Sequence, residues 1–278
     1  ELQAQIDELE SGLTVQSEKW VDKQWNDLLP SAGSVWVYNG KAYYSNYSNQ
    51  YVLNEITDTW ETKTWSGVSS LVGSYVWVYN GKAYYSKDKA QYVLDETTDT
   101  WETKTWSGLN VFSGQNVLII NNKAYFIAGS SIYSLDEATD TWESHEVKGY
   151  SYIDSDGGVC VETLSSYISS YVWVCGDTVY YDGGNSHYIL NLDTYTLEEK
   201  NVWNVDFDLS GIYVWVYNGK AYYSNDKLQY VFDASLNVWV ENNGKEFESP
   251  FVAFSAVYIW SYNGHCYYSS SSVQAELV

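Results

Sequence analysis

The chain has 278 residues, of which 45% are hydrophobic and 18% aromatic, and its formal net charge is −22. A surface this acidic repels phosphate backbones and anionic lipid headgroups, which argues against nucleic acid and membranes as partners. No apolar run approaches the roughly 18 residues that a membrane-spanning helix needs. Three cysteines without regular spacing indicate neither a disulfide framework nor a zinc site.

The first predicted element is a short coiled-coil helix at 1–14. Leu2, Ile6, Leu9 and Leu13 are spaced by four, three and four residues, which is the seam of a heptad repeat. Two heptads are marginal alone because helix nucleation is costly. We therefore expect the C-terminal end of a longer stalk, which implies a homo-oligomer such as a trimer. The alternative is one amphipathic turn that docks on the remaining domain, residues 15–278.

Six copies of one sequence unit follow. The string VWVYNGKAYYS stands at 35–45, 76–86 and 214–224, and weaker copies begin at residues 117, 172 and 259. Successive copies lie 41 to 55 residues apart, close to the period of the four-stranded blades of a β-propeller. An Asn-Gly pair between the first two strands suits a type I′ turn, in which both central residues need positive φ. In the second copy we expect strands at Tyr75–Asn80, Lys82–Ser86, Gln91–Asp95 and Thr100–Trp106.

The N-terminal and C-terminal segments of the chain are predicted to form one blade together. In the sixth copy Gln274–Val278 aligns with the third strand, and the chain then stops. Trp20 and Trp25 are five residues apart, like the paired tryptophans of the fourth strand in other copies. We therefore predict an all-β, six-bladed β-propeller with four-stranded blades, in which an N-terminal strand closes the last blade. Closure also removes the exposed sheet edges that invite aggregation.

The repeat resembles known families. Residues 92–101 read Tyr-Val-Leu-Asp-x-x-Thr-Asp-Thr-Trp, which resembles the kelch repeat, and the likeness covers about 17–278. The double glycine of kelch repeats is absent from most copies, with Gly183-Gly184 the nearest echo. More narrowly, the YYS…QYVLD…TWETKTW pattern resembles repeats in tail-associated proteins of phages and prophages of Gram-positive gut bacteria. That resemblance implies a receptor-binding or fibre protein of the virion.

The largest departure from the repeat marks a candidate binding face. Thirty-one residues separate Trp142 from Trp173, against 17 between Trp60 and Trp77. Loops between second and third strands should emerge on the same face as this insertion, and departures from a repeat are free to serve binding. The alternative is that the insertion only covers a blade edge. The candidate ligand-binding residues are Tyr47, Tyr150, Tyr152, Asp154, Asp156, Tyr167 and His187.

No motif for a nucleophile elbow, a zinc protease or a phosphate loop is present, so we expect no catalytic residues, no metal and no cofactor. The predicted function is a phage tail or fibre-type recognition module that binds a host cell-surface ligand, a glycan or a protein, on the outside of the cell. The alternative is a non-enzymatic structural or protein-docking subunit of a larger particle. A weaker third hypothesis is a glycoside-cleaving enzyme, which would need two suitably separated carboxylates.

Overall fold

The computed structural model describes residues 19–23, 25, 28, 30–109, 112–128, 131–148, 151–153, 159–161, 172–182, 187–199, 213–226, 228–236, 238–241, 254–270 and 273–278. The predicted coiled coil at 1–14 and much of the insertion at 143–171 lie outside these residues. Within the described ranges, no helix is long and apolar enough to span a membrane.

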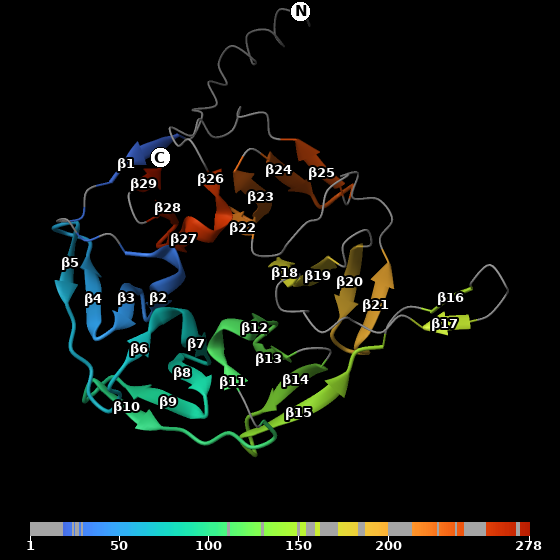
Figure 1. Cartoon of the computed structure of the whole chain (residues 1–278), viewed down its shortest axis with the longest axis horizontal. Helices are drawn as coiled ribbons and strands as arrows, with labels where there is room; N and C mark the ends of the chain where they lie inside the picture. Colours follow the sequence, from blue (N-terminus) through green and yellow to red (C-terminus); the bar gives the residue numbers. More distant parts are fainter. Residues whose placement is uncertain are drawn as a thin grey trace, which may run out of the picture.

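Six antiparallel blades surround a common centre in the described part of the chain (Figure 1). The first five blades follow chain order from the innermost to the outermost strand: β2 (Val35–Tyr38), β3 (Lys41–Tyr47), β4 (Asn49–Asn54), β5 (Thr59–Thr62); β7 (Val76–Tyr79), β8 (Lys82–Asp88), β9 (Ala90–Asp95), β10 (Thr100–Thr103); β12 (Val117–Ile120), β13 (Lys123–Ala128), β14 (Ser131–Asp136), β15 (Thr141–Glu146); β18 (Val172–Cys175), β19 (Thr178–Asp182), β20 (His187–Asn191), β21 (Thr196–Glu199); β22 (Val214–Tyr217), β23 (Lys220–Asp226), β24 (Leu228–Asp233), β25 (Val238–Glu241).

The sixth blade joins the two ends of the chain, as predicted. It contains β27 (Ile259–Tyr262), β28 (His265–Ser269) and β29 (Gln274–Leu277), with β1 (Trp20–Asp22) as its outermost strand. β1 runs antiparallel to β29, with Trp20 opposite Leu277. Backbone hydrogen bonds in both directions between Lys19 and Val278, 2.8 and 3.0 Å long, extend the pairing beyond the strands. The ring is therefore closed by main-chain hydrogen bonds.

Three blades carry a short fifth strand that the sequence did not predict. The segments β6 (Leu71–Val72), β11 (Phe112–Ser113) and β26 (Phe254–Ser255) lead into the next blade and pair with the far end of β3, β8 and β23. Each of these second strands is longer than the innermost strand beside it. The extra residues leave backbone groups that the passing chain satisfies, because buried N–H and C=O groups need partners.

Four blades are built around aromatic side chains of their two innermost strands. In the second blade the Trp77 ring stacks on Tyr84 with centroids 4.5 Å apart, and its Nε1 donates to the buried Oγ of Ser86 at 3.1 Å. The serine matters because a buried donor left without a partner costs about 1–3 kcal/mol. The same arrangement recurs at Trp36, Tyr43 and Ser45, at Trp215, Tyr222 and Ser224, and at Trp260, Tyr267 and Ser269.

The outer tryptophans of a blade pack into two different inter-blade cores, as their spacing predicts. Trp101 packs with Trp36 of the first blade, whereas Trp106 packs with Phe126 of the third. The fourth strand ends at Thr103 and not at Trp106. It ends early because the chain turns toward the third blade, where Ser107 forms a parallel bridge with Thr141.

A second set of contacts joins the blades at the ends of their innermost strands. Tyr79 donates its hydroxyl to the carbonyl of Asn122 in the next blade at 3.2 Å, and Asn80 donates to Glu137 at 2.6 Å. We call this pair of contacts the tyrosine latch. It recurs from the first blade to the second, at Tyr38–Gly81 and Asn39–Glu96, and from the sixth to the first, at Tyr262–Gly40 and Asn263–Glu55.

The latch makes the fold sensitive to alkali. Burial, followed by the nearby carboxylate of a glutamate in the next blade, raises the pKa of Tyr38, Tyr79 and Tyr262 to about 12 from the ordinary value of 10.0. The unfolded chain therefore loses these protons first, so their contribution is complete below pH 10 and is lost as the pH rises through 12. Urea unfolding from pH 8 to 12 should show this fall, and changing all three residues to phenylalanine should reduce it. Equal pH profiles for the two proteins would contradict the assignment.

Candidate functional site

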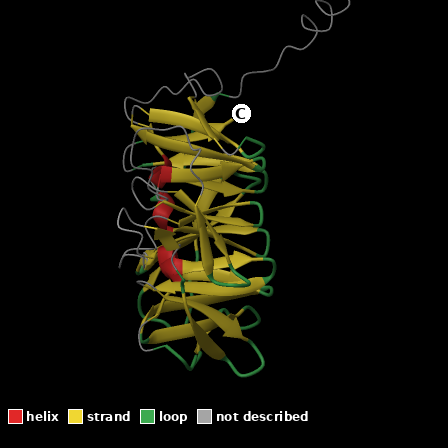
Figure 2. Cartoon of the chain, turned by 90° about the vertical axis from the view of Figure 1, so that its right-hand side faces the viewer, coloured by secondary structure: helices red, strands yellow, loops and turns green. Residues whose placement is uncertain are grey.

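The ring has two faces with different loops. The turns between first and second strands and those between third and fourth strands meet on one face, where Asn39 of the first blade reaches Glu96 of the second. We call this the hairpin face. The opposite face carries the short 3-10 helices, such as Gly73–Tyr75, and the chain crossings between blades, and we call it the helix face. Figure 2 shows the helices along one edge of the ring and the tight turns along the other.

The structure places Tyr47 on the helix face, where the sequence expects binding. Tyr47 lies opposite Leu71 of the crossing segment, has φ +54°, and is 60% exposed. His187, the first residue of β20, is buried and only 9% exposed. Tyr152 lies in the strand β16 (Ser151–Ile153), which pairs with β17 (Val159–Val161). Tyr150, Asp154, Asp156 and Tyr167 lie outside the described residues, so the grouping of these candidates stays a prediction.

A groove of about 270 Å³ opens at the rim of the first blade. It lies between the start of β4 and the end of β5, directly after the exposed Tyr47. Gln50 is 9% exposed, and its Oε1 has no hydrogen-bond partner in the described part of the chain. We call this the first rim groove, and its lining residues are Ser48, Asn49, Gln50, Tyr51, Thr62, Lys63, Thr64, Trp65, Val68 and Ser69.

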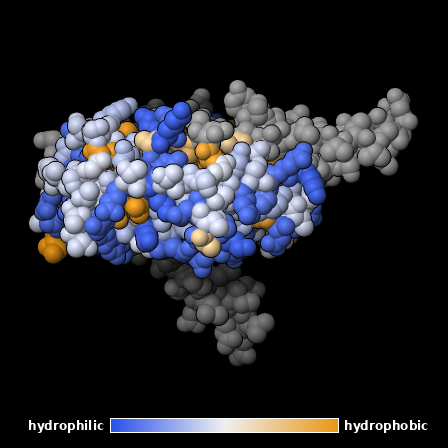
Figure 3. Space-filling view, turned by 90° about the horizontal axis from the view of Figure 1, so that it is seen from below, coloured by the Kyte–Doolittle hydropathy of each residue, from blue (hydrophilic) through white to orange (hydrophobic). Residues whose placement is uncertain are grey.

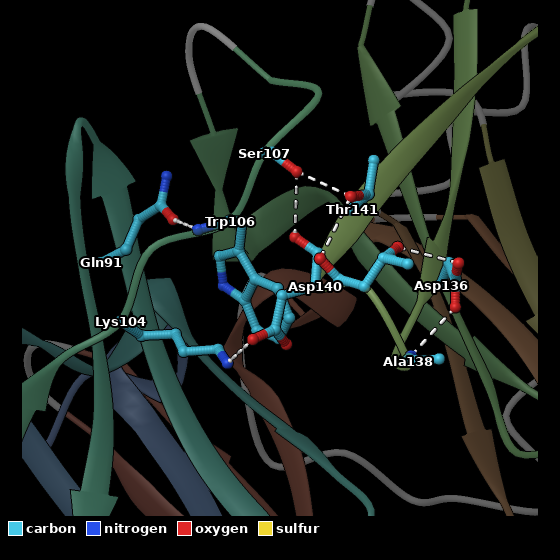
Figure 4. Close-up of polar contacts among 9 residues, drawn as sticks. Gln91, Lys104, Trp106, Ser107, Asp136, Ala138, Asp140 and Thr141 are labelled. Atoms are coloured by element: carbon cyan, nitrogen blue, oxygen red, sulfur yellow. Dashed lines mark hydrogen bonds and ion pairs between the residues drawn. The ribbon is translucent and has the colours of Figure 1, made fainter.

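The second blade has an equivalent groove that differs in two ways. This second rim groove, of about 190 Å³, is lined by Lys89–Tyr92 and Thr103–Thr105. Figure 4 shows that the Oε1 of Gln91 accepts the backbone N–H of Trp106, at 3.0 Å. Asp88 stands where the first blade has Tyr47. Of these two grooves, only the first has an unsatisfied acceptor in its lining and an exposed aromatic residue, Tyr47, next to it in the chain.

One lysine in each groove forms an ion pair within the protein. Lys63 Nζ lies 4.5 Å from the centroid of the Trp65 ring and forms an ion pair with Asp99 of the second blade. Lys104 repeats this arrangement with Trp106 and Asp140, as Figure 4 shows for the ion pair. Because Lys63 already has a carboxylate partner, the first rim groove presents hydroxyls, amides and ring edges rather than net positive charge. This chemistry suits a neutral ligand that is rich in hydroxyl groups.

Sequence reasoning named Tyr47, which is not among the residues that line the first rim groove, and did not name Gln50, Tyr51 or Trp65, which line it. Many aromatic residues of the repeat are buried, so an aromatic residue in the repeat does not by itself indicate a binding site. The gap between two outer strands is set by side-chain packing. The available signal was that the first copy has Tyr47 where the second copy has Asp88, although the strands on either side are nearly identical in the two copies.

Many acidic side chains in the described turns hold the backbone. Asp95 accepts hydrogen bonds from the N–H of Thr97 and the hydroxyl of Thr98, both at 2.9 Å, and these bonds lower the pKa of its carboxyl. Asp136 and Asp233 occupy the same position in their blades. Among the described residues, no group of three or more His, Cys, Asp or Glu side chains could hold a metal ion.

The other histidines lie in side-chain contacts at blade edges. The His145 ring stacks on Tyr195 at a centroid distance of 3.9 Å, and its Nε2 lies 2.7 Å from Ser134 Oγ. Burial lowers the pKa of His145. His265 begins β28, and its Nδ1 lies 2.7 Å from Glu276 Oε1.

The rim seen in Figure 3 is mainly hydrophilic, with separate apolar spots rather than one continuous patch.

Comparison with known proteins shows the fold and no closer relationship. No family model and no curated protein matches the chain. Among solved structures it is similar to YjhT, with a TM-score of 0.54 and 10% identity over 92% of this chain and 95% of the other. It is also similar to YCF48 bound to D1 peptide, with a TM-score of 0.51 and 9% identity over 96% and 98% of the two chains.

A third similar structure is the extracellular domain of the putative hybrid two component system BT4673 from B. thetaiotaomicron, with a TM-score of 0.50 and 9% identity. The match covers 87% of this chain and 33% of the other, so this chain spans about a third of that protein's length. The resemblance to kelch repeats and to phage tail proteins stays a prediction from the sequence. Together, the blade topology and the likeness to these solved structures show that the chain has the fold of a six-bladed β-propeller.

Proposed function

We propose that this propeller is a non-enzymatic recognition module that binds a neutral saccharide through the first rim groove. The observation that carries the proposal is the Oε1 of Gln50 in the first rim groove, which lacks a donor in the described structure and belongs to a residue three positions after the exposed Tyr47. Propellers commonly bind ligands or dock proteins, and a groove with polar groups converging on it is the default binding site.

A sugar satisfies both features of the groove. Its hydroxyl group would donate to Gln50 Oε1, which otherwise stays buried without a partner at a cost of about 1–3 kcal/mol. Its apolar C–H face would pack on the Tyr47 ring, since aromatic rings offer large flat contact areas. The net charge of −22 disfavours acidic polysaccharides through repulsion.

The setting that we propose for this module is a phage tail or fibre that faces the host cell surface. The support comes from the repeat resemblance and from the heptad pattern at 1–14, which would form a homo-oligomer such as a trimer. A host glycan is the proposed partner, and a host protein is the alternative ligand.

Binding to a panel of neutral and acidic bacterial saccharides, followed by calorimetry on the best neutral one, tests the proposal. We expect Tyr47→Ala and Gln50→Leu each to weaken binding about tenfold or more, which corresponds to losing roughly 1.4 kcal/mol. The matched changes Asp88→Ala and Gln91→Leu in the second blade should leave the affinity within about twofold. The proposal fails if no neutral saccharide binds at millimolar concentration, or if the two pairs of variants behave alike.

The projecting hairpin β16–β17 favours protein docking as a second candidate function. Figure 1 shows this hairpin outside the ring, beyond β21. A two-stranded hairpin has exposed edges that can pair with another chain. Replacing residues 151–161 with a short glycine-serine linker should abolish assembly into a larger particle if docking is its role, and should leave saccharide binding unchanged.

A further inference from the structure

The tyrosine latch is missing between the third and fourth blades. Ile120 occupies the latch position, since it lies opposite Lys123 just as Tyr79 lies opposite Lys82. Leu192 of the fourth blade stands where the second and third blades have Glu96 and Glu137. Both partners of the latch are therefore replaced by aliphatic side chains at this junction. Between the fourth and fifth blades Cys175 takes the place of the tyrosine, and its thiol donates to the Gly219 carbonyl at 3.7 Å.

The turn that would accept the latch hydroxyl remains in place. Tyr79 donates to the carbonyl of the second turn residue of the next blade, and the equivalent residue of the fourth blade is Asp177. In the described part of the chain, no hydroxyl takes up that role at Asp177. Asn121 instead faces the Asp177 side chain, with its amide nitrogen 3.0 Å from Oδ1 in the orientation that satisfies both groups. The junction thus keeps the acceptor carbonyl of Asp177 but lacks the tyrosine whose hydroxyl would donate to it.

A cleft of about 250 Å³ lies at this junction, on the hairpin face. Its inner wall is apolar, because Ile120 and Leu190 are buried in one core cluster against which Leu192 packs. Its mouth is polar, with Asp177, Thr178 and Lys123. The complete lining is Ile120, Asn121, Lys123, Tyr125, Asp177, Thr178 and Ile189–Asp193.

We propose that this cleft binds the p-hydroxyphenyl group of a tyrosine side chain that a partner polypeptide presents to the hairpin face. The ring would pack on Ile120 and Leu192, and the hydroxyl would donate to the carbonyl of Asp177, as the chain's own tyrosines do at three other junctions. The cleft is smaller than the roughly 300–1,000 Å³ typical of pockets for drug-sized ligands, so it suits one side chain. Tyrosines that fill such pockets are frequent anchors of protein interfaces.

This site is separate from the proposed saccharide site, which lies on the opposite face and uses other residues. The two proposals can therefore fail independently. Occupation of the cleft would also supply the latch that this junction lacks, so a bound tyrosine should stabilise the ring.

Ligand-detected NMR with N-acetyl-tyrosinamide tests the proposal on the full chain. We expect millimolar binding to the wild-type protein, with N-acetyl-phenylalaninamide at least fivefold weaker because it lacks the hydroxyl. Filling the cleft with Ile120→Tyr and Leu192→Glu should weaken tyrosinamide binding at least tenfold and raise the melting temperature. Lys123→Trp changes an exposed residue at the mouth and should also block binding, whereas the matched Lys82→Trp in the second blade should not.

The converse variant strengthens the test. Tyr79→Ile with Glu137→Leu removes the latch between the second and third blades and should create a second tyrosinamide site. The proposal is overturned if tyrosinamide binds the filled and Lys123→Trp variants as well as it binds the wild type. Equal affinity for the phenylalanine analogue would overturn the role given to the hydroxyl.

Discussion

Replacing Trp25 with alanine should lower the free energy of unfolding by about 3–5 kcal/mol, the range for truncating a buried tryptophan. Its ring is 2% exposed and lies within 6 Å of the rings of Trp60, Trp260 and Tyr267, measured between centroids. Its Nε1 also donates to Asp58 of the first blade at 3.1 Å. This one side chain therefore fastens the N-terminal segment to both the first and the last blade. Urea denaturation followed by tryptophan fluorescence measures the change.

The control for this prediction lies in the strand that precedes Trp25. Val21 is 42% exposed, and Val21→Ala should change the free energy of unfolding by no more than about 0.5 kcal/mol, as is usual for surface positions. A loss below about 1 kcal/mol for Trp25→Ala would show that the N-terminal segment does not hold the ring together.

Replacing Gly108 with alanine should cost about 2–5 kcal/mol, the sum of two penalties. Gly108 has φ +85°, a conformation that costs an L-residue roughly 1–2 kcal/mol. A Cβ atom there would also lie 2.1 Å from the carbonyl oxygen of Trp142, so the backbone must shift, and overpacking typically costs about 1–3 kcal/mol. That shift would disturb the parallel bridge between Ser107 and Thr141. Gly67 approaches the carbonyl oxygen of Trp101, in the second blade, in the same way.

Gly81 is the matched control for the conformational penalty alone. It has φ +68°, but a Cβ atom at Gly81 would meet nothing within 4 Å. Gly81→Ala should therefore cost only the roughly 1–2 kcal/mol of the left-handed conformation. Thermal unfolding of both variants separates the two penalties. Equal melting temperatures would show that a Cβ atom at Gly108 meets no steric penalty from the carbonyl of Trp142.

Most of the architecture could be predicted because the repeated sequence indicates the strands and turns of a blade. The paired tryptophans Trp20 and Trp25 predicted the closing strand, and the structure pairs β1 with β29. The Asn80-Gly81 turn was predicted from its pair of residues, and both have positive φ, at 47° and 68°. Such features depend on local sequence and on burial of both faces of a blade, which a repeated pattern displays directly.

The two proposed sites were harder to predict because each depends on a local departure from the repeat. The copy that begins at residue 117 was used only to count a blade, although its more informative property is that Ile120 replaces a latch tyrosine. Gln50 and Gln91 are the same residue in the same repeat position, yet only Gln91 finds a donor. That difference arises from side-chain packing between two strands, which sequence periodicity does not encode.

The two proposed sites share a physical origin. Each lies where a blade departs from the residues that the second blade has at the same repeat positions. The first rim groove exchanges Asp88 for Tyr47, and the cleft between the third and fourth blades exchanges a latch tyrosine for Ile120. A rigid repeat scaffold with local departures is the usual way in which propellers and other repeat proteins acquire binding surfaces.

Both sites depend on the closed ring, which assigns every loop to one of the two faces. Hydrogen exchange followed by mass spectrometry tests that closure most directly, because the amides of Lys19, Lys23 and Val278 donate to backbone carbonyls across the junction of β1 and β29. The structure predicts that peptides covering 19–23 and 274–278 are protected together and lose protection together in Trp25→Ala. Rapid exchange of residues 19–23 in the wild-type protein, while 265–269 stays protected, would contradict the closed six-bladed ring.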